Sequence, residues 1–307
     1  MSENIKKFGT APVFFTAIST ILGAILFLRF GYAVGTVGFI GVIFIVILGH
    51  LVTIPTSLAI SELATNKRVE GGGEYFIISR SFGLNIGATI GIALYLSQAI
   101  SVAFYVIAFT ESFQFLFDYL KQNYYFTLPR QAISIPIMLF LSALILRKGA
   151  NLGVKALYFV VAILAVSLLL FFLGSPETSN EVSFNFTNAE FRNSEQFFLV
   201  FAIIFPAFTG MTAGVGLSGD LKNPAKSIPI GTVTATVLGM IIYFFISYKL
   251  ASSATPEELT NNQFVMSKIA LWGWIVVPLG LAASTISSAL GSVMVAPRTL
   301  QALANDK

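Results

Sequence analysis

Residues 203–214 read IIFPAFTGMTAG, a helix-breaking sequence inside an apolar segment that is long enough to cross a membrane. Pro206, Thr209, Gly210 and Gly214 fall in the middle of that segment. Proline removes a backbone donor and displaces the carbonyl one turn earlier, while glycine tolerates the dihedral angles that result. Unpaired backbone groups cannot face lipid, but they can line a cavity. The pattern therefore predicts a discontinuous membrane helix whose free backbone groups face a ligand.

The composition of the chain is that of a membrane protein. Of its 307 residues, 56% are hydrophobic and 10% are charged, whereas a soluble domain has about 25% charged residues. Because a spanning helix needs roughly 20 apolar residues, the sequence predicts eight spans, at 12–34, 37–61, 84–117, 131–147, 152–174, 196–217, 228–251 and 269–297. There is no cysteine and one histidine, His50, so a disulfide, a thiol nucleophile and a cysteine-ligated metal are excluded.

Basic residues are distributed unevenly among the polar connections. Twelve lysines and arginines fall on the side that holds the N-terminus, and five fall on the other side. Because cytoplasmic loops are enriched in Lys and Arg, we expect a multi-pass protein of the cell (plasma) membrane with both termini in the cytoplasm. The net charge of +4 is explained by this distribution, so the lipid bilayer is an expected partner and nucleic acid is not.

A second interruption occurs in the first span, where residues 17–31 read AISTILGAILFLRFG. Ser19, Thr20 and Gly23 lie about one turn apart in an otherwise apolar helix. In many transporters, unwound segments occupy paired positions of two inverted repeats; their carbonyls bind cations and their half-helix N-termini bind anions. A single kink is common in membrane helices, but breaks in the first and sixth spans have the spacing of such a repeat. The pair predicts a substrate site between the two helices.

The predicted spans hold no carboxylate or lysine at mid-depth; Arg29 and Glu111 lie toward the outer ends of the first and third spans. A bare charge at the bilayer centre costs on the order of several kcal/mol. Cations would therefore bind together with anions, or a zwitterion such as an amino acid would bind together with sodium. Without a mid-depth acid, base or metal ligand, an enzyme is not expected.

Several longer stretches resemble the cation–chloride cotransporters of the amino acid–polyamine–organocation superfamily. They are STILGAILFLRFGYAVG, GGGEYFIISRSFG, SVAFYVIAFTES, IIFPAFTGMTAGVGLSGDLKNPAKSIPIGT and STISSALGSVMVAPRTLQAL. The similarity covers roughly residues 14–304, and the block around the sixth span is its most specific part.

The resemblance implies an all-α integral membrane protein with ten core helices in two inverted repeats of five, the first and sixth being discontinuous. Residues 1–307 would form a single transmembrane domain, with 1–174 as the first repeat and 196–307 as a second repeat lacking its last two helices. It further implies electroneutral symport of chloride with sodium, potassium or both by alternating access. A homodimer is compatible with this expectation.

The resemblance also assigns ion-binding positions, residue by residue. A potassium site is implied at Thr20, Ile21, Tyr105, Pro206 and Thr209. A sodium site is implied at Ser19, Leu22, Ser284, Ser287 and Ser288. Two chloride sites are implied on the backbone amides of Gly23, Ala24 and Ile25 and of Gly210, Met211 and Thr212. Amides that begin a half-helix carry partial positive charge and suit an anion.

Within the family pattern, Tyr105 and the serine pair at 287–288 favour sodium–potassium–two-chloride symport. The potassium–chloride branch departs from the serine pair, and thiazide-sensitive members carry histidine in place of Tyr105. Thr20 replaces an asparagine and Leu22 a tryptophan, but a carbonyl ligand tolerates both changes. By itself, a serine pair on a membrane helix is more often helix-packing glue. We expect no cofactor and no metal beyond the transported sodium and potassium.

Arg29 and Glu111 lie at similar expected depths. At 1.5 Å per residue, Arg29 is about 13 Å outward from Thr20 and Glu111 about 9 Å outward from Tyr105. The hypothesis is an ion pair that helps to close the outer vestibule, as in the family; the alternative is that each side chain reaches the interface independently.

Two other classes of transport protein remain. A sodium-coupled amino acid permease of the same fold would usually have a glycine-rich first break, whereas STILGAIL has one glycine. A channel is disfavoured because two broken helices around an occluded site suit alternating access better than a continuous pore.

Overall fold

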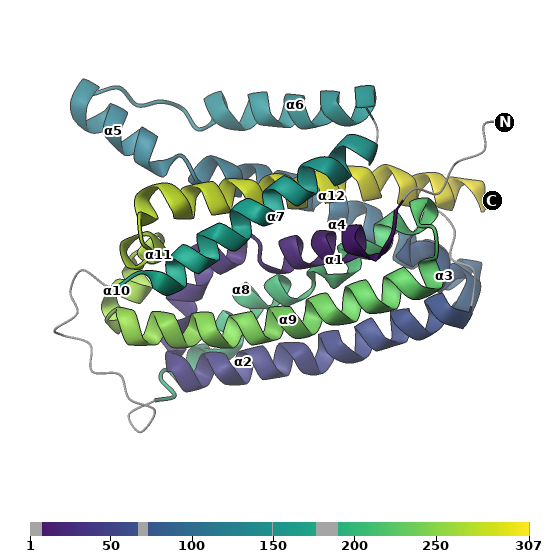
Figure 1. Ribbon diagram of the computed structural model, residues 1–307, viewed down its shortest axis with the longest axis horizontal. Coiled ribbons are helices and arrows are strands. Elements are labelled where there is room, and N and C mark those ends of the chain that lie inside the picture. Colours follow the sequence, from purple (N-terminus) through teal and green to yellow (C-terminus); the bar gives the residue numbers. More distant parts are fainter. Residues whose placement is uncertain (1–7, 67–72, 149, 176–189, 307) are drawn as a thin grey trace.

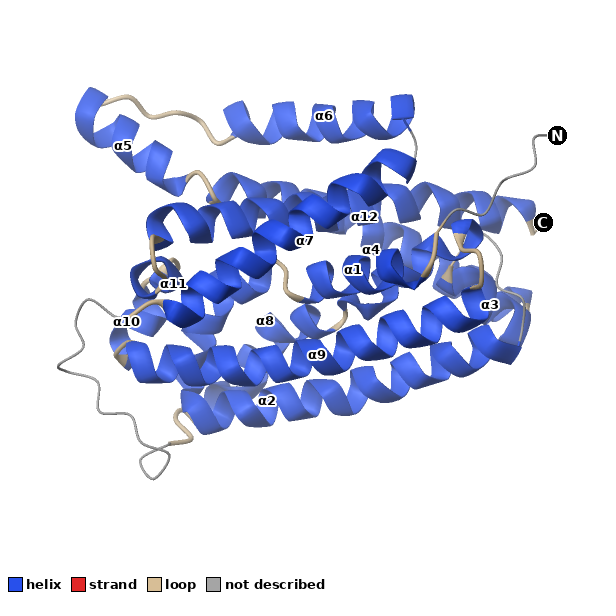
Figure 2. Cartoon of the chain, in the orientation of Figure 1, coloured by secondary structure: helices blue, strands red, loops and turns tan. Residues whose placement is uncertain are grey.

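The computed structural model describes residues 8–66, 73–148, 150–175 and 190–306, and these residues form helices joined by short loops (Figures 1 and 2). In chain order the elements are α1 (Thr10–Ile21), α2 (Ala24–Asn66), α3 (Glu74–Phe82), α4 (Leu84–Glu111), α5 (Gln114–Tyr124), α6 (Gln131–Lys148), α7 (Ala150–Leu173), η2 (Ser194–Gln196), α8 (Phe197–Ile204), η3 (Phe205–Phe208), η4 (Gly210–Asp220), α9 (Pro224–Ser253), α10 (Pro256–Asn261), α11 (Val265–Ile269) and α12 (Gly273–Asn305). Within these ranges, the β-type pairing consists of one isolated bridge between Phe8 and Leu221.

Five helical stretches of the described chain are long and apolar enough to cross a membrane. They are Thr10–Asn66, Leu84–Glu111, Ser194–Asp220, Pro224–Ser253 and Gly273–Asn305. Two shorter apolar stretches, Gln131–Ala143 and Leu157–Leu173, correspond to the fourth and fifth spans expected from the sequence. The all-α membrane fold expected from the sequence is therefore confirmed.

The stretch Thr10–Asn66 contains both of the first two expected spans. The helix bends at Gly38, the second residue of the second expected span, whose φ of 76° lies in the left-handed region that favours glycine. The backbone N–H of Arg192 donates to the carbonyl of Val37 at 2.9 Å. A β-carbon at position 38 would collide with the carbonyl of Glu190. The bend therefore accommodates the chain segment that returns beside it.

The third expected span, 84–117, is shorter than the sequence indicated. Helix α4 ends at Glu111, and the hydroxyl of Ser112 donates to the carbonyl of Phe109 at 2.6 Å. That local hydrogen bond satisfies a carbonyl that would have accepted a backbone N–H if the helix had continued. The chain then turns into α5, which leaves in a new direction (Figure 1). The expected boundary at 117 is therefore wrong.

Helix α9 approaches α1 closely because two of its glycines face that helix. A β-carbon at Gly231 would lie 2.6 Å from the side chain of Val13, and one at Gly239 would lie 2.6 Å from the Cγ2 atom of Ile21. Real β-carbons do not approach so closely, so small residues set the helix separation, as is common in membrane bundles. This packing brings the middle of α9 beside the end of α1.

Both ends of the described chain lie on one side of the bundle, together with α3 and the start of α9 (Figure 1). On this side, the N–H of Lys222 donates to the carbonyl of Phe8 at 2.8 Å. Arg298 pairs with Asp220 at 2.9 Å, and Arg80 pairs with Asp306 at 2.7 Å. The contacts tie the N-terminal segment, η4, α3 and α12 together. We refer to this side as the terminal side.

Candidate functional site

The first helix is interrupted at residues 22 and 23. Helix α1 ends at Ile21, and Leu22 has non-helical dihedral angles (φ −83°, ψ 44°) while its N–H donates to the carbonyl of Ile18 at 2.9 Å. Helix α2 begins directly afterwards, at Ala24. The last carbonyls of α1 and the first amides of α2 are thus left without helical partners.

The sixth span is interrupted at Thr209. Helix α8 gives way to the 3₁₀ helix η3, and a second 3₁₀ helix, η4, begins at Gly210. Pro206 lies in η3, and its carbonyl accepts the hydroxyl of Thr209 at 2.8 Å. A change of helix type within a membrane segment often marks a hinge or a functional position.

The two interruptions are in contact. A β-carbon at Gly210 would lie 2.6 Å from the backbone nitrogen of Ile21 and 2.8 Å from the carbonyl carbon of Thr20. Position 210 therefore admits only glycine without a shift of one backbone. The sequence placed the two breaks opposite each other, and the structure brings them together.

A cavity of about 590 Å³ opens beside the two breaks. Its lining includes all five residues of the implied potassium site, Thr20, Ile21, Tyr105, Pro206 and Thr209. It also includes Gly23, Ala24 and Ile25 of the first implied chloride site, and Arg29 and Glu111 of the expected outer pair. The remaining lining residues are apolar except for Ser97, Ser101 and Gln263. This cavity is the candidate site.

The oxygen atoms around the potassium positions make specific contacts. The Thr20 hydroxyl donates to the carbonyl of Thr16 at 2.8 Å. The carbonyl of Ile21 accepts a hydrogen bond from the hydroxyl of Tyr243 on α9. The donor set is oxygen only, as hard cations prefer.

The implied sodium positions lie where α1 meets α12. The hydroxyls of Ser19 and Ser287 are 3.0 Å apart, and both side chains are buried. Ser284 donates to the carbonyl of Leu281 at 3.0 Å. The Ser288 hydroxyl is buried and close to the Tyr105 hydroxyl, and within the described part of the chain it makes no hydrogen bond of normal geometry. The four serines of the expected sodium site thus come from α1 and α12, which are in contact. Leu22, directly after α1, would contribute its backbone carbonyl.

The two implied chloride positions occupy different surroundings. Gly23, Ala24 and Ile25 lie at the start of α2 and line the cavity. Gly210, Met211 and Thr212 begin η4 but are not part of the cavity lining. The side chain of Thr212 instead interacts with Glu74, at the start of α3 on the terminal side.

Glu74 was not among the residues selected from the sequence. Burial raises the pKa of its carboxyl group above the ordinary value, and the hydrogen bond with Thr212 opposes this shift. The side chain lines a small gap with Gly216 of η4 and Thr299 of α12. A carboxyl group therefore lies on the terminal side of the second implied chloride position.

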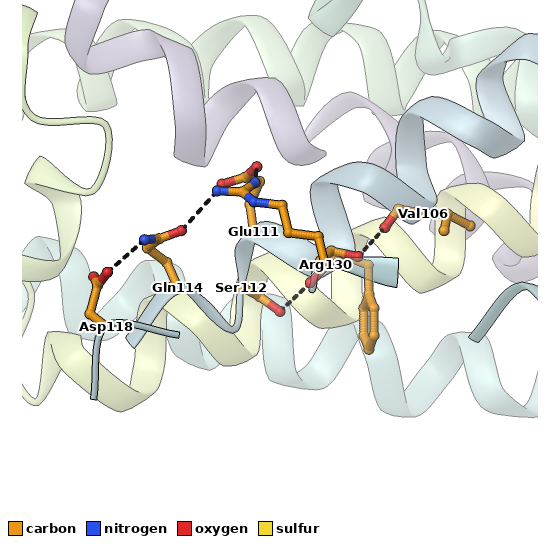
Figure 3. Close-up of polar contacts among 8 residues, drawn as sticks. Val106, Glu111, Ser112, Gln114, Asp118 and Arg130 are labelled. Carbon is orange, nitrogen blue, oxygen red and sulfur yellow. Dashed lines mark hydrogen bonds and ion pairs between the residues drawn. The ribbon is translucent and has the colours of Figure 1, made fainter. Parts of the chain in front are cut away.

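The expected ion pair between Arg29 and Glu111 is not formed in this structure. Glu111 pairs with Arg130, which also donates to the side-chain oxygen of Gln114 at 3.1 Å. Figure 3 shows this chain of contacts continuing to Asp118. Because Glu111 is the last residue of α4, the loop before α6 can bring Arg130 to it directly. An Arg29–Glu111 contact remains a proposal for a closed state of the vestibule.

Tyr243 is a second residue that sequence reasoning missed. Its side chain is fully buried, its ring stacks on Phe30 with centroids 4.5 Å apart, and it meets the edge of Phe208 at 5.2 Å. A buried tyrosine usually finds a hydrogen-bond partner for its hydroxyl, so the sequence did hold a signal. The partner, the Ile21 carbonyl, could not be read from the sequence.

A multi-pass helical bundle in which two interrupted helices meet at a cavity defines the class of the protein as a membrane transporter. The amino acid permease family model matches residues 12–307, and the chain belongs to this family. The described residues contain no cluster of three or more side chains suited to hold a metal.

Relatives of the chain include solute carriers. Human "Solute carrier family 12 member 8" is 33% identical over 98% of this chain and 43% of its own length. Mouse "Solute carrier family 12 member 1" is 30% identical over 98% of this chain and 32% of its own length. Mouse "Solute carrier family 12 member 2" is 31% identical over 99% of this chain and 29% of its own length.

These matches confirm the resemblance to the cation–chloride cotransporters and support a transporter rather than an enzyme. The chain spans less than half of the length of these curated relatives.

Proposed function

We propose that this protein is a secondary active symporter that couples chloride to sodium, potassium or both, electroneutrally and by alternating access. The observation that carries the proposal is the contact between the two helix breaks beside one cavity. Neutral oxygen donors and free helix-terminal amides meet there. Opposite charges bound side by side would offset the cost of placing each in a membrane.

Potassium is assigned to the oxygens of Thr20, Ile21, Tyr105, Pro206 and Thr209, all of which line the cavity. Sodium is assigned to the contact between α1 and α12, with Ser19, Leu22, Ser284, Ser287 and Ser288. The close approach of Ser19 and Ser287 supports this second assignment.

Chloride is assigned to the amides that begin α2 and η4. The amides of Gly23, Ala24 and Ile25 start a long helix, where the helix dipole favours an anion. The amides of Gly210, Met211 and Thr212 are assigned to a second chloride ion.

The orientation of the protein in the membrane and its division into two repeats are proposed from the sequence pattern. The terminal side would be cytoplasmic, and residues 1–174 and 196–307 would form the two inverted repeats. Under this orientation the cavity, with Arg29 and Glu111 at the end away from the terminal side, opens outward. A homodimer in the plasma membrane is part of the same proposal.

A sodium-coupled amino acid permease is the second candidate. A cavity of about 590 Å³ has room for an organic zwitterion as well as for small ions, and the matching family model is that of amino acid permeases.

The test is uptake into proteoliposomes that contain the 307-residue protein. Rubidium and sodium uptake are measured with chloride or gluconate outside, and again with a panel of amino acids. We expect uptake of at least one cation to require chloride and to generate no current. Amino acid uptake that needs sodium but ignores chloride would replace the proposal with its alternative.

A further inference from the structure

Tyr243 lies directly behind the proposed potassium site without lining it. Its hydroxyl donates to the Ile21 carbonyl, and its side chain has no exposed surface. Ile21, which accepts this hydrogen bond, lines the cavity together with Tyr105. Tyr243 would therefore contact the Ile21 carbonyl that faces a bound cation, and not the cation itself.

The position of the Tyr243 hydroxyl is fixed by packing. The ring lies between Phe30 of α2 and Phe208 of η3, which hold it by a stacked and an edge-to-face contact. Gly239, one turn earlier on α9, allows the helix to approach Ile21. Elements from both broken helices therefore determine where this one donor points.

A carbonyl oxygen has two lone pairs and can accept a hydrogen bond while it also faces a cation. Ile21 ends α1, so its carbonyl has no helical N–H partner and would otherwise be free to tilt. A hydrogen bond from Tyr243 restricts that tilt. It also draws electron density from the oxygen, which lowers the field that a cation experiences.

We propose that Tyr243 is a positioning residue for the cation, which aims the Ile21 carbonyl into the cavity and sets its preference for potassium over sodium. A weaker carbonyl field favours the larger ion, because less is gained by stripping water from the smaller one; number and field strength of carbonyl dipoles are recognised determinants of such selectivity. The inference rests on the proposed cation binding at this site.

The test compares Tyr243→Phe with Tyr158→Phe. The first change keeps the ring and its packing but removes the hydroxyl. The second makes the same chemical change at an exposed tyrosine of α7, whose ring contacts Phe15. Half-saturation by rubidium and by sodium is measured in chloride-dependent uptake, and the melting temperature is measured in chloride salts of rubidium, sodium and a large organic cation.

We expect Tyr243→Phe to raise the rubidium half-saturation about three- to tenfold, the change that corresponds to one ordinary hydrogen bond. Half-saturation by sodium, which is assigned to the separate contact between α1 and α12, should stay near the wild-type value, as should all properties of Tyr158→Phe. If the Tyr243 hydroxyl only stabilised the end of α1, its removal would instead lower the melting temperature equally in every salt. The ratio of the two half-saturation values would then stay unchanged. That result would overturn the inference.

A second variant tests the direction of the effect. Replacing Tyr243 with 3,5-difluorotyrosine gives a stronger donor in nearly the same volume, so the preference for rubidium over sodium should increase. A decrease, or no change, contradicts the inference even if Tyr243→Phe fails to fold. If the wild-type protein shows no cation dependence in either uptake or melting, the proposed function fails instead.

Discussion

The hydroxyl oxygens of Ser19 and Ser287 lie 3.0 Å apart and join the last turn of α1 to the middle of α12. The contact is buried, and it connects residues 268 positions apart in the chain. It is one of the points at which an interrupted helix touches a continuous one. A cation bound there would contact both helices, so its binding would depend on their relative position, as alternating access requires.

Replacing Ser287 with alanine should weaken sodium dependence selectively. One oxygen ligand is lost, while Ser19 keeps its hydrogen bond to the carbonyl of Thr16 at 3.2 Å. We expect the sodium half-saturation to rise about tenfold, which corresponds to about 1.4 kcal/mol, with little change for rubidium. Sodium-dependent uptake measured against rubidium-dependent uptake checks this.

Ser292→Ala is the matched control, because Ser292 is also a buried serine of α12. If both alanine variants raise the sodium half-saturation equally, the assignment of Ser287 to a sodium site is contradicted.

Replacing Gly210 with alanine should separate the two breaks. The added β-carbon would meet the backbone of Thr20 and Ile21 at 2.6–2.8 Å, and backbone cannot rotate away as a side chain can. Overpacking of this kind costs about 1–3 kcal/mol, so we expect a lower melting temperature and loss of uptake. Gly291→Ala, where nothing lies within 4 Å of the added atom, should be neutral or stabilising. Full uptake by Gly210→Ala would show that the breaks need not touch.

The positions of the helices and of the breaks could be predicted because both depend on local sequence. Apolar runs set the spans, and Pro206, Gly210 and Gly23 coincide with the two interruptions. The 3₁₀ form of residues 205–208 and 210–220 was not predicted. In η4, a β-carbon at Gly214 would lie 2.6 Å from the carbonyl oxygen of Val13 in α1, and such contacts between distant segments cannot be read from the local sequence.

The partners of individual polar groups were harder to predict than the helices. Glu111 was expected to meet Arg29 from their similar depths and from the family resemblance, but it meets Arg130, because α4 ends where the sequence suggested that it continues. Tyr243 looked like one more aromatic residue in an apolar helix. Its hydrogen bond to Ile21 depends on the distance between α9 and α1, which no local pattern encodes.

Charge reversal tests whether Arg29 and Glu111 meet in a closed vestibule. We expect Arg29→Glu and Glu111→Arg each to abolish most uptake. Their combination should restore it when Arg130 is also changed to glutamine, since Arg130 would otherwise repel the new arginine at position 111. Uptake of the variants, corrected for protein inserted, is the measurement.

Arg130→Gln alone is the control for this triple variant. The Arg130 side chain is 54% exposed, and exposed pairs contribute about 0–1 kcal/mol, so its effect should be small. A triple variant no more active than the single reversals would indicate that the two charges act independently.

Glu74 should make stability depend on pH in a specific direction. Burial raises the pKa of its carboxyl group in the folded protein, so the folded state holds the proton more tightly than the unfolded chain does. The free energy of unfolding therefore falls as pH rises above the ordinary value near 4.5 and stops falling above the raised pKa.

Glu74→Gln removes this dependence. It should melt at a higher temperature than the wild type at neutral pH, and the difference should vanish at acidic pH where both side chains are neutral. Glu62→Gln, an exposed change at the end of α2, should melt like the wild type throughout. A Glu74→Gln protein that is less stable than the wild type at neutral pH would contradict this prediction, because it would mean that the ionised carboxylate is held by a favourable partner.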